Sequence, residues 1–169
     1  VIPWTDDYWP LTDVNMAKRY ITTKEFKSFD EQILDVNTMI AEKADLSNLS
    51  PAEKYDYITG DTRYAVSRES WSTYESYNSM YSNHSDWSWM GICHGWAPAA
   101  YMEKAPKHAV LVKKGGREVM FYEGDIRGLL SKAWAINRNQ GGTDFMGSRC
   151  NDKVEDFVTD ANSRPVDGV

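Results

Sequence analysis

The chain has 169 residues, of which 41% are hydrophobic and 26% are charged, so it can form one globular domain and is not a disordered tail. No apolar run approaches the roughly 20 residues that cross a bilayer, and the net charge of −6 argues against nucleic acid or anionic lipid as a partner. The unusual feature is the content of 7 tryptophans and 10 tyrosines, whose amphipathic rings suit a binding cleft.

Residues 1–25 open with an irregular stretch rich in proline, aspartate and tryptophan. Because proline disfavours a helix there, we expect this stretch to lie across the core as a pinned arm. The first residue is Val1 rather than methionine, which is typical of a mature chain after removal of a signal or pro-segment, although an expressed fragment would look the same. We therefore expect a secreted or periplasmic protein.

Two helices are predicted next. Residues 26–44 place apolar side chains every three or four positions, as on a one-faced helix. These positions are Phe26, Phe29, Ile33, Val36 and Ile40. A second helix is predicted to begin after Ser50, which can cap it, while Glu53 can reach back to the cap amide. Pro51 suits its first turn, and Gly60 suits its end.

The remaining elements mix helix and strand. Residues 61–88 are polar without a clear period, so we expect short helices and surface loop there. A third helix is predicted over residues 93–104, and a hairpin is predicted from strands at 108–112 and 118–122. Asp125 is expected to cap a last helix, which carries an apolar face. That face consists of Ile126, Leu129, Leu130, Ala133 and Trp134. The predicted class is α+β, a single helix-rich domain with a small antiparallel sheet that is incomplete by itself.

The segment around Cys93 carries the strongest chemical signal. A cysteine at the amino end of a helix has its thiolate stabilised by unpaired amides and by the helix dipole, and the same amides can hold an oxyanion. We expect Gly91 and Gly95 to let a substrate backbone approach. Trp89 and Trp96 are expected to wall a cleft, with the Trp89 indole N–H as an oxyanion donor. The alternative is that Cys93 is a buried structural residue, the usual fate of a lone cysteine.

Four stretches form a recognisable set, namely PWTDDYWP at 3–10, SPAEKYD at 50–56, WMGICHGW at 89–96 and GSRCN at 147–151. Together they resemble the transglutaminase-elicitor family, known from secreted oomycete proteins and some bacteria. The resemblance implies a papain-like core in which a cysteine on a central helix packs against a sheet. It also implies transfer of a glutamine acyl group to a lysine amine through a thioester, with Cys93 as nucleophile.

Such a nucleophile needs a base, normally a histidine on a later strand, yet no histidine follows His108. The resemblance implies that the base belongs to a carboxy-terminal part, which we expect as a second chain of the same precursor that also completes the sheet. His94 adjoins Cys93 but points about 100° away on a helix, so it is expected as a cap or a cleft wall. His84 lies in the polar stretch and carries no signal. Cys150 is expected to form a disulfide with a cysteine outside this chain.

No cofactor is required by the sequence, since it has no calcium loop, zinc-binding histidine pair or phosphate loop; calcium dependence stays open. The expected function is a protein-glutamine gamma-glutamyltransferase that cross-links glutamine and lysine side chains of proteins. A related papain-like peptidase or a glutamine deamidase would share the thioester and differ in the acyl acceptor. A non-catalytic, aromatic-rich binding module is the alternative of another class.

Overall fold

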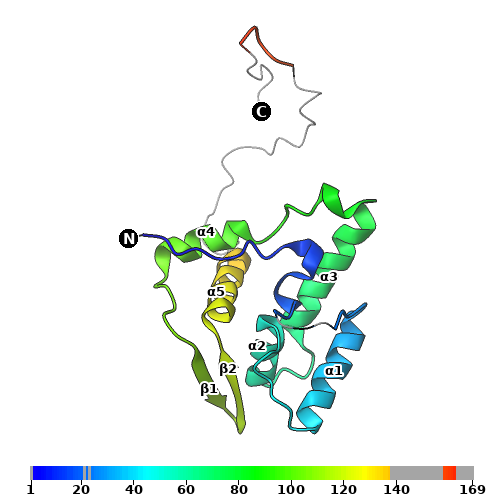
Figure 1. Ribbon diagram of the computed structural model, residues 1–169, viewed down its shortest axis with the longest axis vertical. Coiled ribbons are helices and arrows are strands. Elements are labelled where there is room, and N and C mark those ends of the chain that lie inside the picture. Colours follow the sequence, from blue (N-terminus) through cyan, green and yellow to red (C-terminus); the bar gives the residue numbers. More distant parts are fainter. Residues whose placement is uncertain (1, 21, 23, 138–157, 163–169) are drawn as a thin grey trace. The chain divides into compact units, whose positions relative to one another are not determined.

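The computed structural model describes residues 2–20, 22, 24–137 and 158–162 (Figure 1). The chain divides into two compact units, residues 1–137 and 138–169, and the elements below belong to the first. In chain order they are α1 (Phe29–Ala41), α2 (Pro51–Thr59), α3 (Ala65–Met80), α4 (Cys93–Met102), β1 (Val110–Lys114), β2 (Arg117–Phe121) and α5 (Glu123–Asn137), with short 3-10 helices at Leu11–Asp13, Asn15–Ala17 and His84–Asp86. The predicted α+β class with a small antiparallel sheet is confirmed. In the part of the chain that is described, no helix has the length and apolar character needed to cross a bilayer.

The amino-terminal arm is pinned to the core, as predicted. Trp4 and Trp9 are buried, and the residues up to Pro10 form no helix. Backbone hydrogen bonds join the arm to the segment before α4: Leu11 N–H donates to the Met90 carbonyl at 2.9 Å. The arm therefore braces the entry to the helix that begins at Cys93.

The first two predicted helices are confirmed. Helix α1 buries Phe29 and Val36 on one face. Helix α2 has the predicted capping box, in which the Ser50 hydroxyl accepts the Glu53 N–H at 3.2 Å and the Glu53 carboxylate accepts the Ser50 N–H at 2.6 Å. Gly60 ends α2 with φ +74°, a left-handed conformation that favours glycine.

The prediction of short helix and loop over residues 61–88 is wrong for most of that segment, because α3 runs unbroken from Ala65 to Met80. The N–H groups at its start are capped by a side chain of α2. The buried carboxylate of Asp56 accepts the N–H groups of Val66 and Ser67 at 3.1 and 2.9 Å. The helix buries serines and one tryptophan rather than a regular apolar stripe, so neither its cap nor its buried face shows as a local pattern.

The predicted hairpin is confirmed with shifted ends. Strands β1 and β2 pair from Val110 opposite Phe121 to Lys114 opposite Arg117. The turn is only Gly115 and Gly116, both with positive φ, so the lysines before them belong to the strand. Both glycines in that conformation are typical of a tight type I′ turn.

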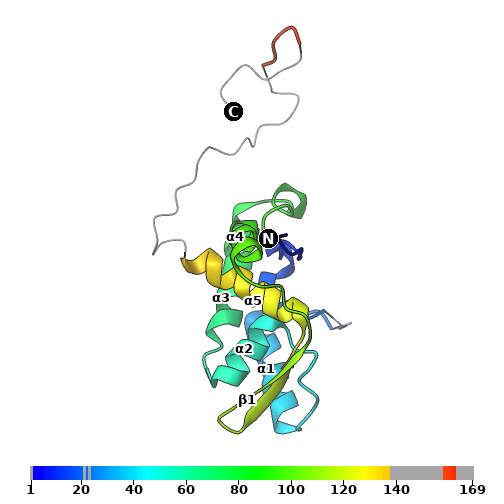
Figure 2. The same cartoon turned by 90° about the vertical axis from the view of Figure 1, so that its left-hand side faces the viewer.

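Helix α5 begins at Glu123, two residues before the predicted cap at Asp125. Asp125 still closes the helix start, since its carboxylate reaches back and accepts the Tyr122 N–H at 2.7 Å. The helix leads from the end of β2 back toward α4 (Figure 2). Its apolar residues divide: Leu130 and Trp134 pack toward α4, while Ile126 and Leu129 pack toward the hairpin and α2.

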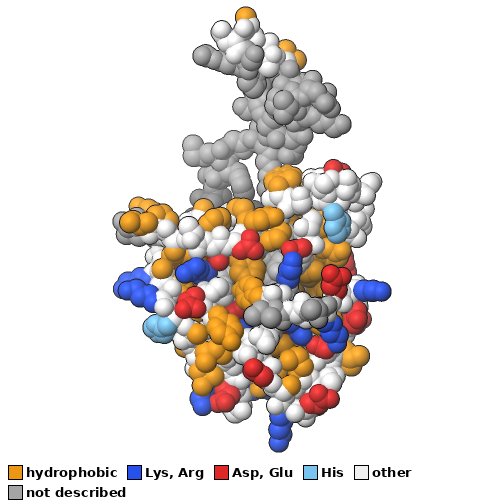
Figure 3. All heavy atoms as spheres, in the orientation of Figure 1, with side chains coloured by type: hydrophobic (Ala, Val, Ile, Leu, Met, Phe, Trp, Pro, Cys, Tyr) orange, Lys and Arg blue, Asp and Glu red, His pale blue; other side chains and the backbone are white. Residues whose placement is uncertain are grey.

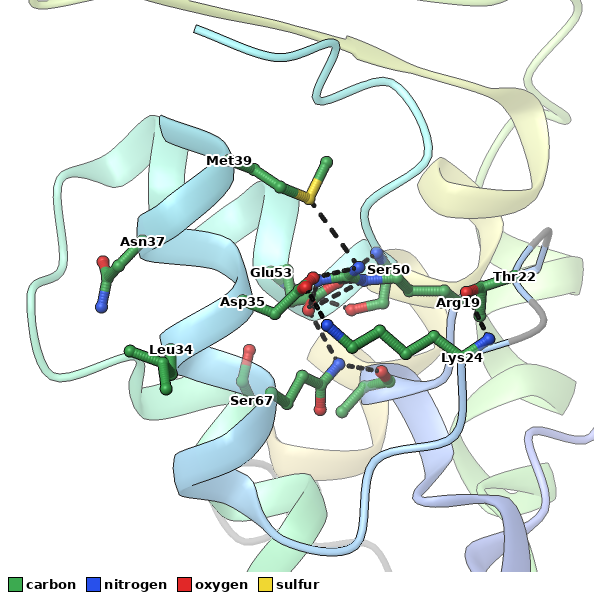
Figure 4. A network of polar contacts seen from close by, with 12 residues as sticks. Arg19, Thr22, Lys24, Leu34, Asp35, Asn37, Met39, Ser50, Glu53 and Ser67 are labelled. Carbon is green, nitrogen blue, oxygen red and sulfur yellow. Dashed lines mark hydrogen bonds and ion pairs between the residues drawn. The ribbon is translucent and has the colours of Figure 1, made fainter. Parts of the chain in front are cut away.

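The first turn of α2 is buried and holds two oppositely charged neighbours. Glu53 is fully buried and receives two N–H groups of Arg19, at 2.8 and 2.9 Å, and the Gln32 amide at 2.8 Å (Figure 4). Lys54 is equally buried, and its ammonium lies 2.6 Å from the Asp125 carboxylate. These two pairs tie α2 to the segment before α1 and to the start of α5.

Replacement of Lys54 by methionine should cost about 3–5 kcal/mol in the free energy of unfolding, because the Asp125 charge stays buried without its partner. Lys18→Met is the matched control, since the pair of Lys18 with Asp13 is exposed and its loss should cost at most about 1 kcal/mol. Chemical denaturation measures both. The double variant Lys54→Met/Asp125→Asn should be more stable than Lys54→Met alone, and equal losses for Lys54 and Lys18 would contradict the buried-pair interpretation.

Asp35 accepts hydrogen bonds from Arg19 and Lys24. Burial acts to raise the pKa of Asp35, but these two bonds outweigh it and hold the pKa below its ordinary value. A lowered pKa stabilises the fold above the unfolded value of about 4, and this contribution is lost as the pH falls through the folded pKa. Asp35→Asn should therefore cost about 1 kcal/mol near neutrality, with the deficit closing below about pH 4. Denaturation across pH 2–7 tests it, with exposed Glu25→Gln as control; a pH-independent deficit would contradict the assignment.

Candidate active site at the start of helix α4

Cys93 is the first residue of α4, and its side chain is exposed. The N–H groups of Gly95 and Trp96 donate to the Ile92 carbonyl at 2.8 and 3.0 Å, which marks the first closed turn of the helix. The amides before that turn have no carbonyl of the same helix to pair with, and the helix dipole places partial positive charge there. The structure thus excludes the alternative of a buried Cys93 and places its thiol at the amino end of the helix.

The turn that carries Cys93 is held by the arm. Ile92 is buried and donates its N–H to the Tyr8 carbonyl at 2.9 Å. Gly91 is required by this contact, because a Cβ there would stand 2.1 Å from the same carbonyl. The Tyr8 hydroxyl donates to the Ser88 carbonyl at 3.0 Å. Tyr8 therefore forms hydrogen bonds with both Ser88 and Ile92, at the two ends of the segment before Cys93. Tyr8 carries no separate signal in the sequence, although the motif at 3–10 contains it.

Gly95 has a matching role on the other side of the helix. A Cβ at Gly95 would lie 2.1 Å from the Ser131 carbonyl and 2.6 Å from the Ala135 Cβ, so α4 and α5 meet there with no room for a side chain. The expectation that Gly91 and Gly95 admit a substrate backbone is therefore wrong. The protein's own arm and α5 fill the space beside both glycines.

The two tryptophans of the motif differ in environment. Trp89 is 47% exposed, and its indole N–H donates to the Asp86 carbonyl at 3.1 Å. A role in an oxyanion hole would require that N–H to leave Asp86. Trp96 is partly buried, donates to the Trp4 carbonyl at 3.4 Å and packs in a core cluster with Trp4 and Trp134. Trp89 therefore presents its ring to solvent, whereas Trp96 mainly anchors α4.

The histidines occupy three different places. His94 is exposed and follows Cys93 directly in the helix. His108 follows the opposite end of α4, and a helix of ten residues is about 15 Å long. His84 contacts the Asn78 side chain at 2.9 Å and the Trp87 ring, which makes it part of the packing after α3. Neither His84 nor His108 is thus placed as a base for Cys93.

Two further features considered from the sequence are Cys150 and a possible metal site. Cys150 lies outside the described residues, so its disulfide stays a prediction. Within the described ranges, no group of three or more histidine, cysteine or acidic side chains is arranged to hold a metal ion. The geometry therefore centres on Cys93, with exposed Trp89 four residues before it and exposed His94 directly after it in the chain.

Comparison with models of known protein families gave a match. The family model described as Transglutaminase elicitor matches residues 1–168. The comparison with curated proteins and the comparison with solved structures each found no match. The family match spans the arm, the α2 start and the Cys93 turn, the three parts that the geometry connects.

Gly95→Ala should destabilise the protein by about 1–3 kcal/mol, because the added methyl group overlaps the backbone of α5. Ala97→Val is the control on the same helix, since Ala97 is exposed and a larger side chain there meets solvent. Thermal unfolding of the two variants gives the comparison. If Gly95→Ala were as stable as the unaltered protein, α4 and α5 could not meet as closely as described.

Proposed function

The chain belongs to the transglutaminase elicitor family, and on that premise we propose that it is a protein-glutamine gamma-glutamyltransferase with Cys93 as the nucleophile. The observation that carries the proposal is the position of Cys93, an exposed thiol at the first residue of a helix whose entry is fixed by two backbone hydrogen bonds to the arm. Placement at a helix amino end offers backbone N–H groups to the oxyanion that attack by the sulfur creates.

The proposed reaction has two steps that share the thioester. The Cys93 thiolate attacks the carboxamide carbon of a glutamine side chain, and the C–N bond breaks as ammonia leaves with a proton from the general acid. A lysine amine of a second protein then attacks the thioester carbon and loses a proton to the same base. The C–S bond breaks, an isopeptide bond remains, and the thiolate is regenerated. Exposed Trp89 is proposed as a contact for the glutamine-bearing protein.

The acid and base of this reaction are proposed to come from a partner. His84 is engaged elsewhere and His108 follows the far end of α4, so we propose a carboxy-terminal chain of the same precursor that carries a histidine to Cys93. A disulfide from Cys150 to that chain is part of the same proposal. Secretion or periplasmic export after cleavage of a precursor would provide the oxidising compartment that such a disulfide needs.

Three alternatives to the transferase, namely a deamidase, a peptidase and a non-catalytic binding module, can be told apart experimentally. If water rather than lysine takes the acyl group, the enzyme is a glutamine deamidase, which releases ammonia without a cross-link. A peptidase would instead cleave the backbone of the donor protein. In a non-catalytic binding module, iodoacetamide would alkylate Cys93 at neutral pH no faster than it alkylates an ordinary exposed thiol, because an unactivated thiol is mostly protonated there.

Cys93→Ala should abolish cross-linking of a glutamine peptide to a fluorescent amine and leave the fold intact, because the exposed sulfur contributes little packing. The assay uses the secreted protein with every chain that co-purifies under native conditions, and a thermal melt of each variant controls for unfolding. Intact mass without reductant shows whether a second polypeptide is attached.

Near-normal cross-linking by Cys93→Ala would disprove the nucleophile. Full activity of residues 1–169 alone would disprove the need for a second chain and assign the base to His94 or His108. Trp89→Phe separates a contact through the ring, which should leave turnover near normal, from donation by the indole N–H, whose loss typically costs about 10²–10³ in turnover.

A further inference from the structure

Glutamine is scarce in this chain. Gln32 and Gln140 are its two glutamines, whereas it has nine asparagines and eleven lysines. Asparagine ends in the same carboxamide as glutamine but is one methylene shorter, and a site fitted to one side chain rejects such a neighbour by about 10–200-fold. For the reaction proposed above, the chain therefore offers many amines as acyl acceptors and very few carboxamides as acyl donors.

The one glutamine within the described residues is inaccessible. Gln32 in α1 is 1% exposed. Its amide nitrogen donates to the Ala17 carbonyl at 2.7 Å and to the Glu53 carboxylate at 2.8 Å. Its amide oxygen accepts the Trp71 indole N–H. A thiolate of another molecule can reach this carboxamide only if α1 separates from the core, so Gln32 is not an acyl donor in the folded protein. Gln140 lies outside the described residues.

Two lysines have the opposite setting, in the linker between α4 and β1. Lys104 and Lys107 are exposed, and neither side chain has an ion-pair or hydrogen-bond partner among the described residues. Residues 104–109 form neither helix nor strand, and no backbone hydrogen bond joins them to another described part of the chain. Such a segment can fit its backbone to the cleft of another protein, as sites of proteolytic cleavage do. Basic side chains also project at the edges of the space-filling view (Figure 3).

Lysines elsewhere in the unit are engaged with acidic side chains. Lys18 and Lys24 have side chains that are 57% and 53% exposed, yet they pair with Asp13 and Asp35. An ion-paired ammonium must lose its partner as well as its proton before it can attack a thioester, so we expect these two lysines to react more slowly. They are therefore matched controls for the pair in the linker.

We infer that this protein accepts acyl groups on Lys104 and Lys107 but donates none from residues 1–137, so that it becomes joined to glutamine-bearing proteins without polymerising through that unit. The inference rests on the proposed function. The two lysines follow the far end of α4, whose ten residues extend about 15 Å from Cys93, so the transfer occurs between two copies of the chain.

In this transfer the Lys104 amine, after loss of one proton to water, attacks the thioester carbon held on Cys93 of another copy. The C–S bond breaks, the second proton of the amine goes to the departing sulfur, and an isopeptide bond remains. Lys107 reacts in the same way.

A transglutaminase of unrelated fold tests the surface without relying on Cys93. With a biotinylated glutamine peptide as donor, peptide mapping by mass spectrometry should place most of the label on Lys104 and Lys107. The double variant Lys104→Arg/Lys107→Arg should lower the total label at least about threefold, because a guanidinium stays protonated and does not replace the amine. Lys18→Arg/Lys24→Arg should lower it by less than about 1.5-fold.

With a biotinylated amine as the probe instead, residues 1–137 should take up no label. Ala105→Gln is the positive control, because it places a glutamine in the same exposed linker and should create a labelled site. Label on Gln32, or equal effects of the two lysine double variants, would overturn the inference.

The activity of the protein itself is the second test, with every chain that co-purifies under native conditions. Given the glutamine peptide, the unaltered protein should label its own Lys104 and Lys107, and Cys93→Ala should label neither. If the protein joins a separate glutamine peptide to an amine but leaves its own lysines unlabelled, the inference fails while the proposed function stands. Failure of all cross-linking would instead overturn the proposed function and, with it, transfer from Cys93.

Discussion

The buried first turn of α2 is the constraint on which the remaining structure depends. Glu53 and Lys54 are consecutive, fully buried and oppositely charged, so each needs its own partner on a different side of the helix. Glu53 draws Arg19 and Gln32 inward, and Lys54 draws Asp125. Both acids also reach back to the amide before their own helix, Glu53 in α2 and Asp125 in α5. Burial of two opposite charges side by side therefore fixes the directions of three segments at once.

The position of Cys93 follows from this arrangement through packing. Because Lys54 holds the start of α5, the later part of that helix meets Gly95 of α4 at backbone contact. The arm closes the other side through Tyr8 and Gly91. The thiol is thus exposed but stands on a rigid base, which is the combination that a surface nucleophile requires.

Local signals in the sequence were sufficient where an element is specified by its own residues. The capping box at Ser50, the apolar spacing of α1 and the glycine pair of the hairpin each act within a few positions, and all were predictable. Helix α3 was missed because its cap comes from Asp56 and its buried face consists largely of serines. The roles of Gly91 and Gly95 could not be predicted either, because the atoms that exclude a side chain belong to residues far away in the chain. For the same reason Glu53 could be predicted to cap α2, but its buried ion pair with Arg19 could not be predicted.

The contact between the arm and the Cys93 turn also has a consequence for synthesis on the ribosome. Tyr8 emerges early, but the segment that it holds lies more than eighty residues later, and α5 follows after a further thirty. Contacts of such separation form late, since loop closure must precede them. The thiol is consequently without its supports throughout most of translation and acquires them only when the unit is nearly complete.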